Sequence, residues 1–111
     1  MKKRCFALVA VLLTAGMPAG SRALDRGPET IDLKERFQVE GNKKAVIFPH
    51  HLHQAGLACA DCHQDPAGGG SLLVEFVNKS GVANDFHKKF CWPCHEEKKV
   101  TRGKSCSTCH K

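Results

Sequence analysis

The chain has 111 residues, including 17 Lys+Arg, 11 Asp+Glu, seven His and seven Cys, and its formal net charge is +6. This length accommodates one small domain and excludes a multi-domain enzyme. Aromatic residues make up only 6% of the chain and Tyr is absent. A core of protein side chains alone would therefore be thin, and we expect a disulfide, metal or cofactor to reinforce it.

Residues 1–23 have the pattern of a cleaved secretory signal peptide. Basic residues at positions 2–4 precede an apolar run through Ala15, and the small residues Ser21 and Ala23 form a cleavage site. The apolar run is too short for a transmembrane helix, which takes about 20 residues. We therefore expect export to the periplasm, with no stable membrane anchor after cleavage. An uncleaved N-terminal anchor is the alternative interpretation.

Cleavage after Ala23 changes the composition that matters for function. It removes Cys5 and both methionines, and leaves 88 residues with six Cys and no Met. Four basic residues leave as well, so the formal charge falls from +6 to +2. This removes most of the case for nucleic-acid binding, which needs a clustered basic face. We expect residues 24–30 to form a flexible N-terminal extension and residues 31–111 to form the domain.

The six remaining cysteines all lie in Cys-x-x-Cys-His motifs. The three motifs are Cys59, Cys62 and His63; Cys91, Cys94 and His95; and Cys106, Cys109 and His110. This is the attachment pattern of c-type haem. Two thiols three positions apart can form thioethers to the two vinyl groups of one haem, and the next residue offers an imidazole nitrogen to the iron. Three matches that use every remaining cysteine predict three covalently bound c-type haems.

Other uses of paired cysteines fit this spacing less well. A structural zinc ion takes four ligands, which do not divide naturally among three pairs that each carry their own His. Redox Cys-x-x-Cys sites normally occur once in a chain. Disulfides within the motifs would close small, strained loops. A zinc-binding interaction module is the non-haem alternative.

Counting the histidines narrows the chemistry of the irons. The proximal ligands would be the motif histidines, His63, His95 and His110. Four further histidines are available for three sixth positions: His50, His51, His53 and His87. Without Met, the His/Met ligation that raises haem potential is excluded, so we predict low-potential bis-His haems. Such irons have no open position and suit electron transfer rather than catalysis. A small multihaem reductase, with one histidine released to open an iron, is the alternative.

The spare histidines differ in their local context. His50 and His53 are three residues apart, so on a helical turn they share a face and could serve two haems. His51 would point elsewhere, as a solvent-exposed or propionate-bonded side chain, or would replace His50 as a ligand. His87 lies four residues before Cys91, and we expect it on a helix that leads into the second motif. If His87 were only a surface residue, one iron would lack a ligand.

The order Phe-x-His-x-x-His, then three Cys-x-x-Cys-His motifs with a His four residues before the second, resembles a known family. It is similar to the three-haem periplasmic cytochromes of the cytochrome c-seven type, which are related to the tetrahaem class III cytochromes c. The resemblance covers about residues 31–111 and is strongest in 48–54 and 94–111. It implies an electron carrier with bis-His haems. It also implies the ligand pairs His50 with His63, His53 with His95, and His87 with His110.

The expected fold is a small multihaem cytochrome, with a short N-terminal two-stranded antiparallel hairpin followed by short helices and loops packed around three haems. Residues 36–39 and 45–48 read as the two strands, on either side of a turn-rich stretch. The connection 64–86 is longer than the resemblance implies. Within it we expect a helix over residues 72–80, with an exposed strand over 74–77 as the alternative.

Basic residues gather between the last two motifs, namely Lys98, Lys99, Arg102 and Lys104. They form either a solvated face or a docking patch for acidic redox partner proteins. We expect no nucleic-acid partner, and we expect the protein to be a monomer.

Overall fold

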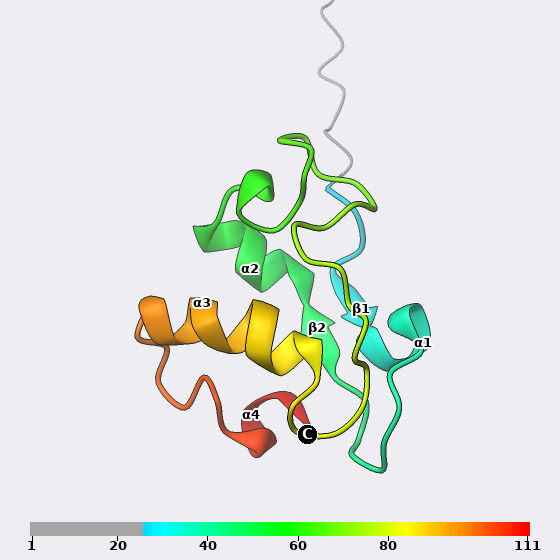
Figure 1. Cartoon of the computed structure of the whole chain (residues 1–111). Coiled ribbons are helices and arrows are strands. Elements are labelled where there is room, and N and C mark those ends of the chain that lie inside the picture. Colours follow the sequence, from blue (N-terminus) through cyan, green and yellow to red (C-terminus); the bar gives the residue numbers. More distant parts are fainter. Residues whose placement is uncertain (1–25) are drawn as a thin grey trace, which may run out of the picture.

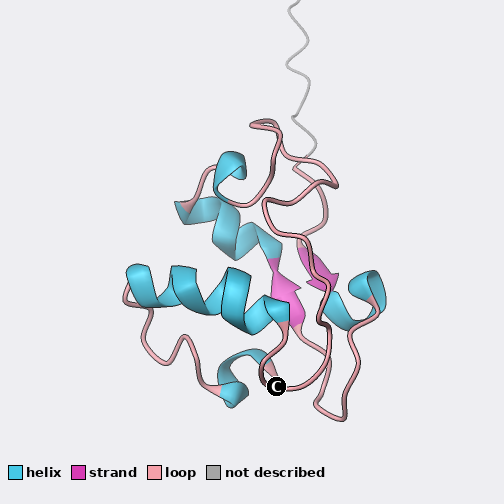
Figure 2. Ribbon diagram, viewed as in Figure 1, coloured by secondary structure: helices cyan, strands magenta, loops and turns pink. Residues whose placement is uncertain are grey.

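A computed structural model describes residues 26–111, so the signal peptide expected over residues 1–23 lies outside the described residues (Figure 1). The elements are β1 (Thr30–Asp32), α1 (Leu33–Phe37), β2 (Ile47–Pro49), α2 (His50–Gly56), the 3-10 turn η1 (Cys59–Asp61), the wide π-type turn η2 (Phe86–Cys91), α3 (Trp92–Glu97) and α4 (Cys106–Cys109). Short helices joined by long loops dominate the architecture (Figure 2). No helix in this described part is long and apolar enough to cross a membrane.

The two strands pair antiparallel, with Ile31 opposite Phe48. The expected two-stranded antiparallel hairpin is therefore confirmed, and its second strand overlaps the predicted one. The predicted first strand is wrong, because residues 36–39 lie at the end of α1 and just beyond it, and β1 precedes that helix. The hairpin is thus formed by a strand closer to the N-terminus than the hydrophobic pattern indicated.

A local capping interaction explains this difference. The Asp32 carboxylate accepts hydrogen bonds from the backbone N–H groups of Lys34 and Glu35, at 2.9 and 3.0 Å. These bonds satisfy donors that have no partner inside a helix, so the chain turns into α1 directly after β1. Gln38 ends α1 in the left-handed conformation, with φ 56°. A strand could not continue through this turn.

The predicted helix over residues 72–80 is also wrong, and the alternative strand does not form. The Leu73 N–H donates to the Cys62 carbonyl at 2.9 Å, so this segment bonds back to the first motif. The Val77 N–H donates to the Asp85 carboxylate at 2.8 Å. Backbone donors that would serve an α-helix are therefore taken by groups elsewhere in the fold.

The extension before β1 reaches α2. We expect residues 24–30 to form a flexible extension. The structure describes residues 26–30 of this segment, and they make hydrogen bonds to α2. The Arg26 carbonyl accepts from Gln54 Nε2 at 2.6 Å, and the Glu29 carbonyl accepts from the backbone N–H of His51 at 3.1 Å. The segment thus supplies acceptors along one side of α2.

The buried apolar side chains of the described residues form a single aromatic cluster. Phe76 and Phe86 are 9% and 7% exposed, and their rings stack with centroids 3.8 Å apart. Phe37 from α1 meets both rings edge-on, at 5.4 and 5.3 Å, and Phe90 from η2 meets Phe76 at 5.4 Å. The cluster joins α1, the connection 64–86 and η2, and no larger protein core accompanies it in this part of the chain.

Replacing Phe76 should therefore cost a large share of the stability. We expect Phe76→Ala to lower the free energy of unfolding by about 3–5 kcal/mol, the usual range for a buried Phe. Val77→Ala, at a neighbouring side chain that is 73% exposed, should change it by less than about 0.5 kcal/mol. Chemical denaturation of the purified protein, followed by circular dichroism, measures both. Equal effects would show that the aromatic cluster is not the core.

Candidate functional site

Each Cys-x-x-Cys segment occupies a helical turn. In the first and third motifs, which lie on η1 and α4, the N–H of the trailing histidine donates to the carbonyl of the first cysteine four residues earlier. These bonds are His63 to Cys59 and His110 to Cys106, both 2.8 Å long. Residues three apart on such a turn lie on the same side, so the two thiols of a motif are neighbours and the histidine follows them.

The second motif spans the junction of η2 and α3. Cys91 ends the wide turn, and Cys94 and His95 lie within α3. Pro93 stands near the start of α3, where the missing N–H of proline removes no helical hydrogen bond. The motif therefore also sits on continuous helical backbone.

The motif cysteines differ in exposure, because Cys59 and Cys106 are exposed whereas the other four are partly buried. Burial, together with the neighbouring Cys109, Cys62 and Cys94, raises the pKa of Cys91 to about 12. Cys91 is therefore a protonated thiol at neutral pH, whereas redox dithiol sites lower the pKa of their reactive thiol. The cysteines of the described residues are free rather than paired in disulfides. The environment of Cys91 therefore does not resemble that of a reactive redox thiol.

Six histidine rings face one another in three pairs. The ring centroids are 6.3 Å apart for His50 and His63, 6.2 Å for His53 and His95, and 6.4 Å for His87 and His110. The interplanar angles are 66°, 15° and 78° in the same order. These are the three pairs that the family resemblance implies. Each pair joins one motif histidine to a histidine from α2 or η2.

This spacing fits two imidazoles on opposite sides of one metal ion. Metal–imidazole bonds of about 2.0–2.1 Å, on opposite sides of one ion, place the two ring centres about 6.3–6.5 Å apart. Within residues 26–111, no three His, Cys, Asp or Glu side chains gather to hold a metal ion. Each pair can thus supply two ligands but not four. A metal that brings its own planar ring of ligands, as haem iron does, matches this donor set.

Backbone carbonyls orient five of the six paired rings through Nδ1. The contacts are His50 with Pro28 at 2.8 Å, His53 with Pro49 at 3.0 Å, His87 with Val82 at 2.9 Å, His95 with Gly103 at 2.7 Å and His110 with Lys44 at 2.6 Å. A carbonyl can only accept, so Nδ1 carries the hydrogen and the neutral ring keeps the Nε2 lone pair for a metal. His63 differs, because its Nδ1 is buried without a partner among the described residues.

One comparison with known proteins found a match, and it agrees with this geometry. The family described as cytochrome c7 and related cytochrome c matches residues 46–111. The chain belongs to this family. As a cytochrome c7 relative it is a small multihaem electron-transfer cytochrome with covalently bound c-type haem. No curated protein and no solved structure matches the chain.

His51 belongs to none of the three pairs of this cytochrome. Its side chain is exposed, and its Nδ1 contacts the Glu29 carbonyl at 3.1 Å. His50 and His53, on either side of it in α2, pair with His63 and His95 instead. His50 and His53, three residues apart in α2, therefore both lie against motif histidines, whereas His51 between them does not.

Gly103 is a functional residue that the sequence reasoning missed. It is buried, its carbonyl accepts from His95 Nδ1, and a Cβ at this position would lie 2.8 Å from the His95 Cβ. Its one sequence signal is that it is the only glycine between the last two motifs of the cytochrome. Trp92 was also missed; its ring stacks on His87 with centroids 4.5 Å apart and 12° between the planes.

The basic residues between the last two motifs are all exposed, but two of them have partners. Lys104 forms an ion pair with Glu96 at 3.1 Å, and Arg102 donates to the Ser107 hydroxyl at 3.2 Å. Both side chains of the ion pair are more than half exposed, so it contributes little to stability. Lys98 and Lys99 lie in the same exposed stretch.

The close approach of Gly103 to His95 makes a specific prediction. Gly103→Ala should push the His95 ring away and weaken its Nδ1 hydrogen bond. In the haem-loaded cytochrome, one iron should then be high-spin in a fraction of the molecules. Gly70→Ala is the matched control, because a Cβ there meets nothing within 4 Å. Electron paramagnetic resonance of the oxidised proteins measures the spin state. A fully low-spin Gly103→Ala variant would contradict the prediction.

Proposed function

We propose that this cytochrome is a periplasmic electron carrier with three bis-His haems. The observation that carries the proposal is the similar spacing of three histidine pairs. One histidine of each pair belongs to a complete Cys-x-x-Cys-His motif. The thioether cysteines would be Cys59 and Cys62, Cys91 and Cys94, and Cys106 and Cys109. The axial ligands would be His50 and His63, His53 and His95, and His87 and His110.

Bound haem supplies a reversible one-electron change at its iron. The task of the chain is to hold that iron between two imidazoles, so that no position is open to a substrate. The carbonyls of Pro28, Pro49 and Val82 serve this task by fixing the tautomer and orientation of one ring in each pair. Such hydrogen bonds also make imidazole a stronger donor, which favours the oxidised iron and a low potential.

The small protein core supports the same proposal. Phe76 and Phe86 are the only apolar side chains of the described residues that are nearly fully buried, so side-chain packing by itself stabilises little. A chain of this kind gains folding free energy from the group that its ligands bind, as small metal-dependent domains do. We infer that the cytochrome folds as it acquires haem.

The proposed location and partners rest on features of the sequence. The signal-peptide pattern of residues 1–23 supports export to the periplasm, with no membrane anchor left after cleavage. The exposed residues Lys98, Lys99, Arg102 and Lys104 would steer acidic redox partner proteins toward the last two motifs. We propose a monomer that meets these partners transiently.

The haem count is the direct test of the proposed function. Three complete motifs that use all six cysteines after residue 23 predict an intact mass that exceeds the mature polypeptide by three haems. Mass spectrometry of the protein purified from the periplasm measures this excess. An excess of two haems, or of none, would overturn the count.

The histidines of α2 give a second test. His53→Ala should leave one iron without its sixth ligand, which makes it partly high-spin and raises its potential. His51→Ala is the matched control, because its exposed ring belongs to no pair, and this variant should stay fully low-spin. Both variants are compared by paramagnetic resonance after three haems are confirmed in each. A high-spin iron in His51→Ala alone would show that the ligand assignment is wrong.

A further inference from the structure

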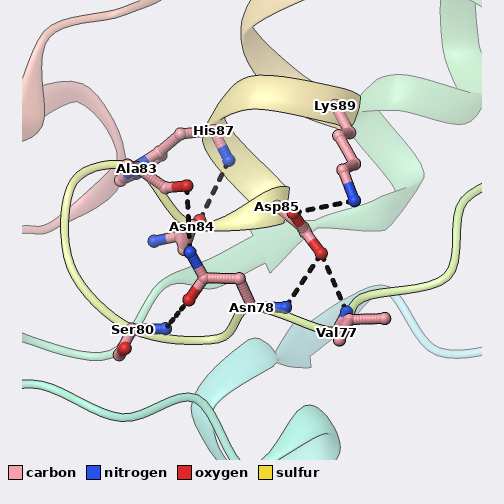
Figure 3. Close-up of polar contacts among 8 residues, drawn as sticks. All are labelled: Val77, Asn78, Ser80, Ala83, Asn84, Asp85, His87 and Lys89. Carbon is pink, nitrogen blue, oxygen red and sulfur yellow. Dashed lines mark hydrogen bonds and ion pairs between the residues drawn. The ribbon is translucent and has the colours of Figure 1, made fainter.

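A single buried carboxylate closes the loop that precedes His87 (Figure 3). Asp85 is 5% exposed, and one of its oxygens accepts from the backbone N–H groups of Val77 and Asn78, at 2.8 and 2.9 Å. The Asp85 N–H donates in turn to the Asn78 carbonyl at 2.8 Å, and Lys89 lies 3.1 Å from the second carboxylate oxygen. Residues 77–85 are therefore tied into a closed loop at its two ends.

This loop holds His87 at two places. The carbonyl of Val82, in the middle of the loop, contacts His87 Nδ1 at 2.9 Å. The side-chain oxygen of Asn84 accepts from the His87 backbone N–H at 3.0 Å, and the Asn84 amide nitrogen donates to the Gly81 carbonyl at 2.7 Å. Asn84 is itself only 7% exposed. The position of the His87 ring thus depends on the shape of the loop.

The ring plane of His87 is set between two aromatic neighbours. It lies nearly parallel to Trp92, at 12°, and nearly perpendicular to its partner His110, at 78°. Rotation of the His87 ring would break the hydrogen bond to Val82 and disturb the stacking on Trp92. The loop and the tryptophan therefore select the same orientation.

We propose that Asp85 is a positioning residue for the iron ligand His87. By closing residues 77–85, Asp85 holds the Val82 carbonyl where it keeps the His87 ring crossed with the ring of His110. The inference rests on the proposed function, because it requires one iron between these two rings. It gives part of the long connection 64–86 a role, since that connection contains the loop and the backbone donors that Asp85 binds.

The angle between two axial rings has a spectroscopic consequence. Each imidazole interacts most strongly with the iron orbital perpendicular to its own plane. Parallel rings therefore split two iron orbitals in energy, whereas crossed rings leave them nearly equal. Crossed pairs give a highly anisotropic low-spin signal in paramagnetic resonance, and parallel pairs give a less anisotropic one. The signals of His87 with His110, at 78°, and of His53 with His95, at 15°, should thus be distinguishable.

The experiment uses the full haem-loaded protein and compares variants of one carboxylate. Asp85→Ala should shift one strongly anisotropic signal toward lower anisotropy or to high spin, while the signal of the near-parallel pair is unchanged. Asp85→Asn retains an oxygen that can accept from the N–H groups of Val77 and Asn78, so this variant should keep the native signal. Lys89→Ala, which removes only the ion pair, should resemble the native protein.

A second carboxylate in the same connection is the matched control. Asp65 is exposed and accepts one bond, from the Ala67 N–H at 2.8 Å, outside the closed loop. Asp65→Ala should therefore leave all three signals unchanged. An equal shift in Asp65→Ala would show that the effect is not specific to Asp85 and would overturn the inference.

The outcomes separate this inference from the proposed function. If the native protein does not contain three low-spin irons, the proposed function fails. If the native protein is as proposed and Asp85→Ala keeps three haems with unchanged signals, only the positioning role is wrong. Should Asp85→Ala not accumulate, Asp85→Ser, which is too short to hold both donors, is measured in its place. If neither accumulates while Asp85→Asn does, Asp85 is a residue required for folding and the positioning role is rejected.

Discussion

Two imidazole rings that share a metal ion must keep a nearly fixed separation, and we propose that this constraint acts on three ring pairs of this fold, whose centroids lie 6.2–6.4 Å apart. In each pair, one ring follows the cysteines on a helical turn, and the other arrives from a segment distant in the sequence. The helix α2 supplies two of these rings, so it must face both the first and the second motif. The short elements and long loops follow from this demand, because their positions are determined by where rings must lie rather than by packing against a core.

The sequence predicts the motifs better than the architecture around them. Thioether attachment needs cysteines and histidine at fixed spacing on one turn, so the motifs are visible in five consecutive residues. The partner histidines are not local; four candidates were available for three positions, and the family resemblance, not the spacing, suggested the pairs. The hairpin was confirmed in type, but its first strand was misplaced, because the alternating pattern of residues 36–39 lies where α1 ends. The capping carboxylate of Asp32 starts this helix directly after β1.

The connection 64–86 shows why the remainder could not be predicted. The apolar residues of its segment 72–80 suggested a helix, yet among them only Phe76 is buried, against rings from α1 and η2. The backbone donors that follow it bind Asp85, seven or eight residues later in the chain. A carboxylate that accepts backbone hydrogen bonds in this way produces no periodic pattern in the sequence. Every residue has a backbone carbonyl, so the sequence does not show which carbonyls accept from the paired histidine rings.

The carbonyl acceptors also explain how one chain can give its three histidine pairs different ring geometries. The acceptor for His53 is Pro49, four residues earlier on the same turn, whereas His50, three residues before His53, bonds to Pro28 outside the helix. The two rings thus have acceptors of different origin, and they meet their partners at 15° for His53 and 66° for His50. His87 takes its acceptor from a third source, a closed loop. Because the orientations have separate origins, a substitution near one ring can alter one histidine pair while leaving the other two pairs in place.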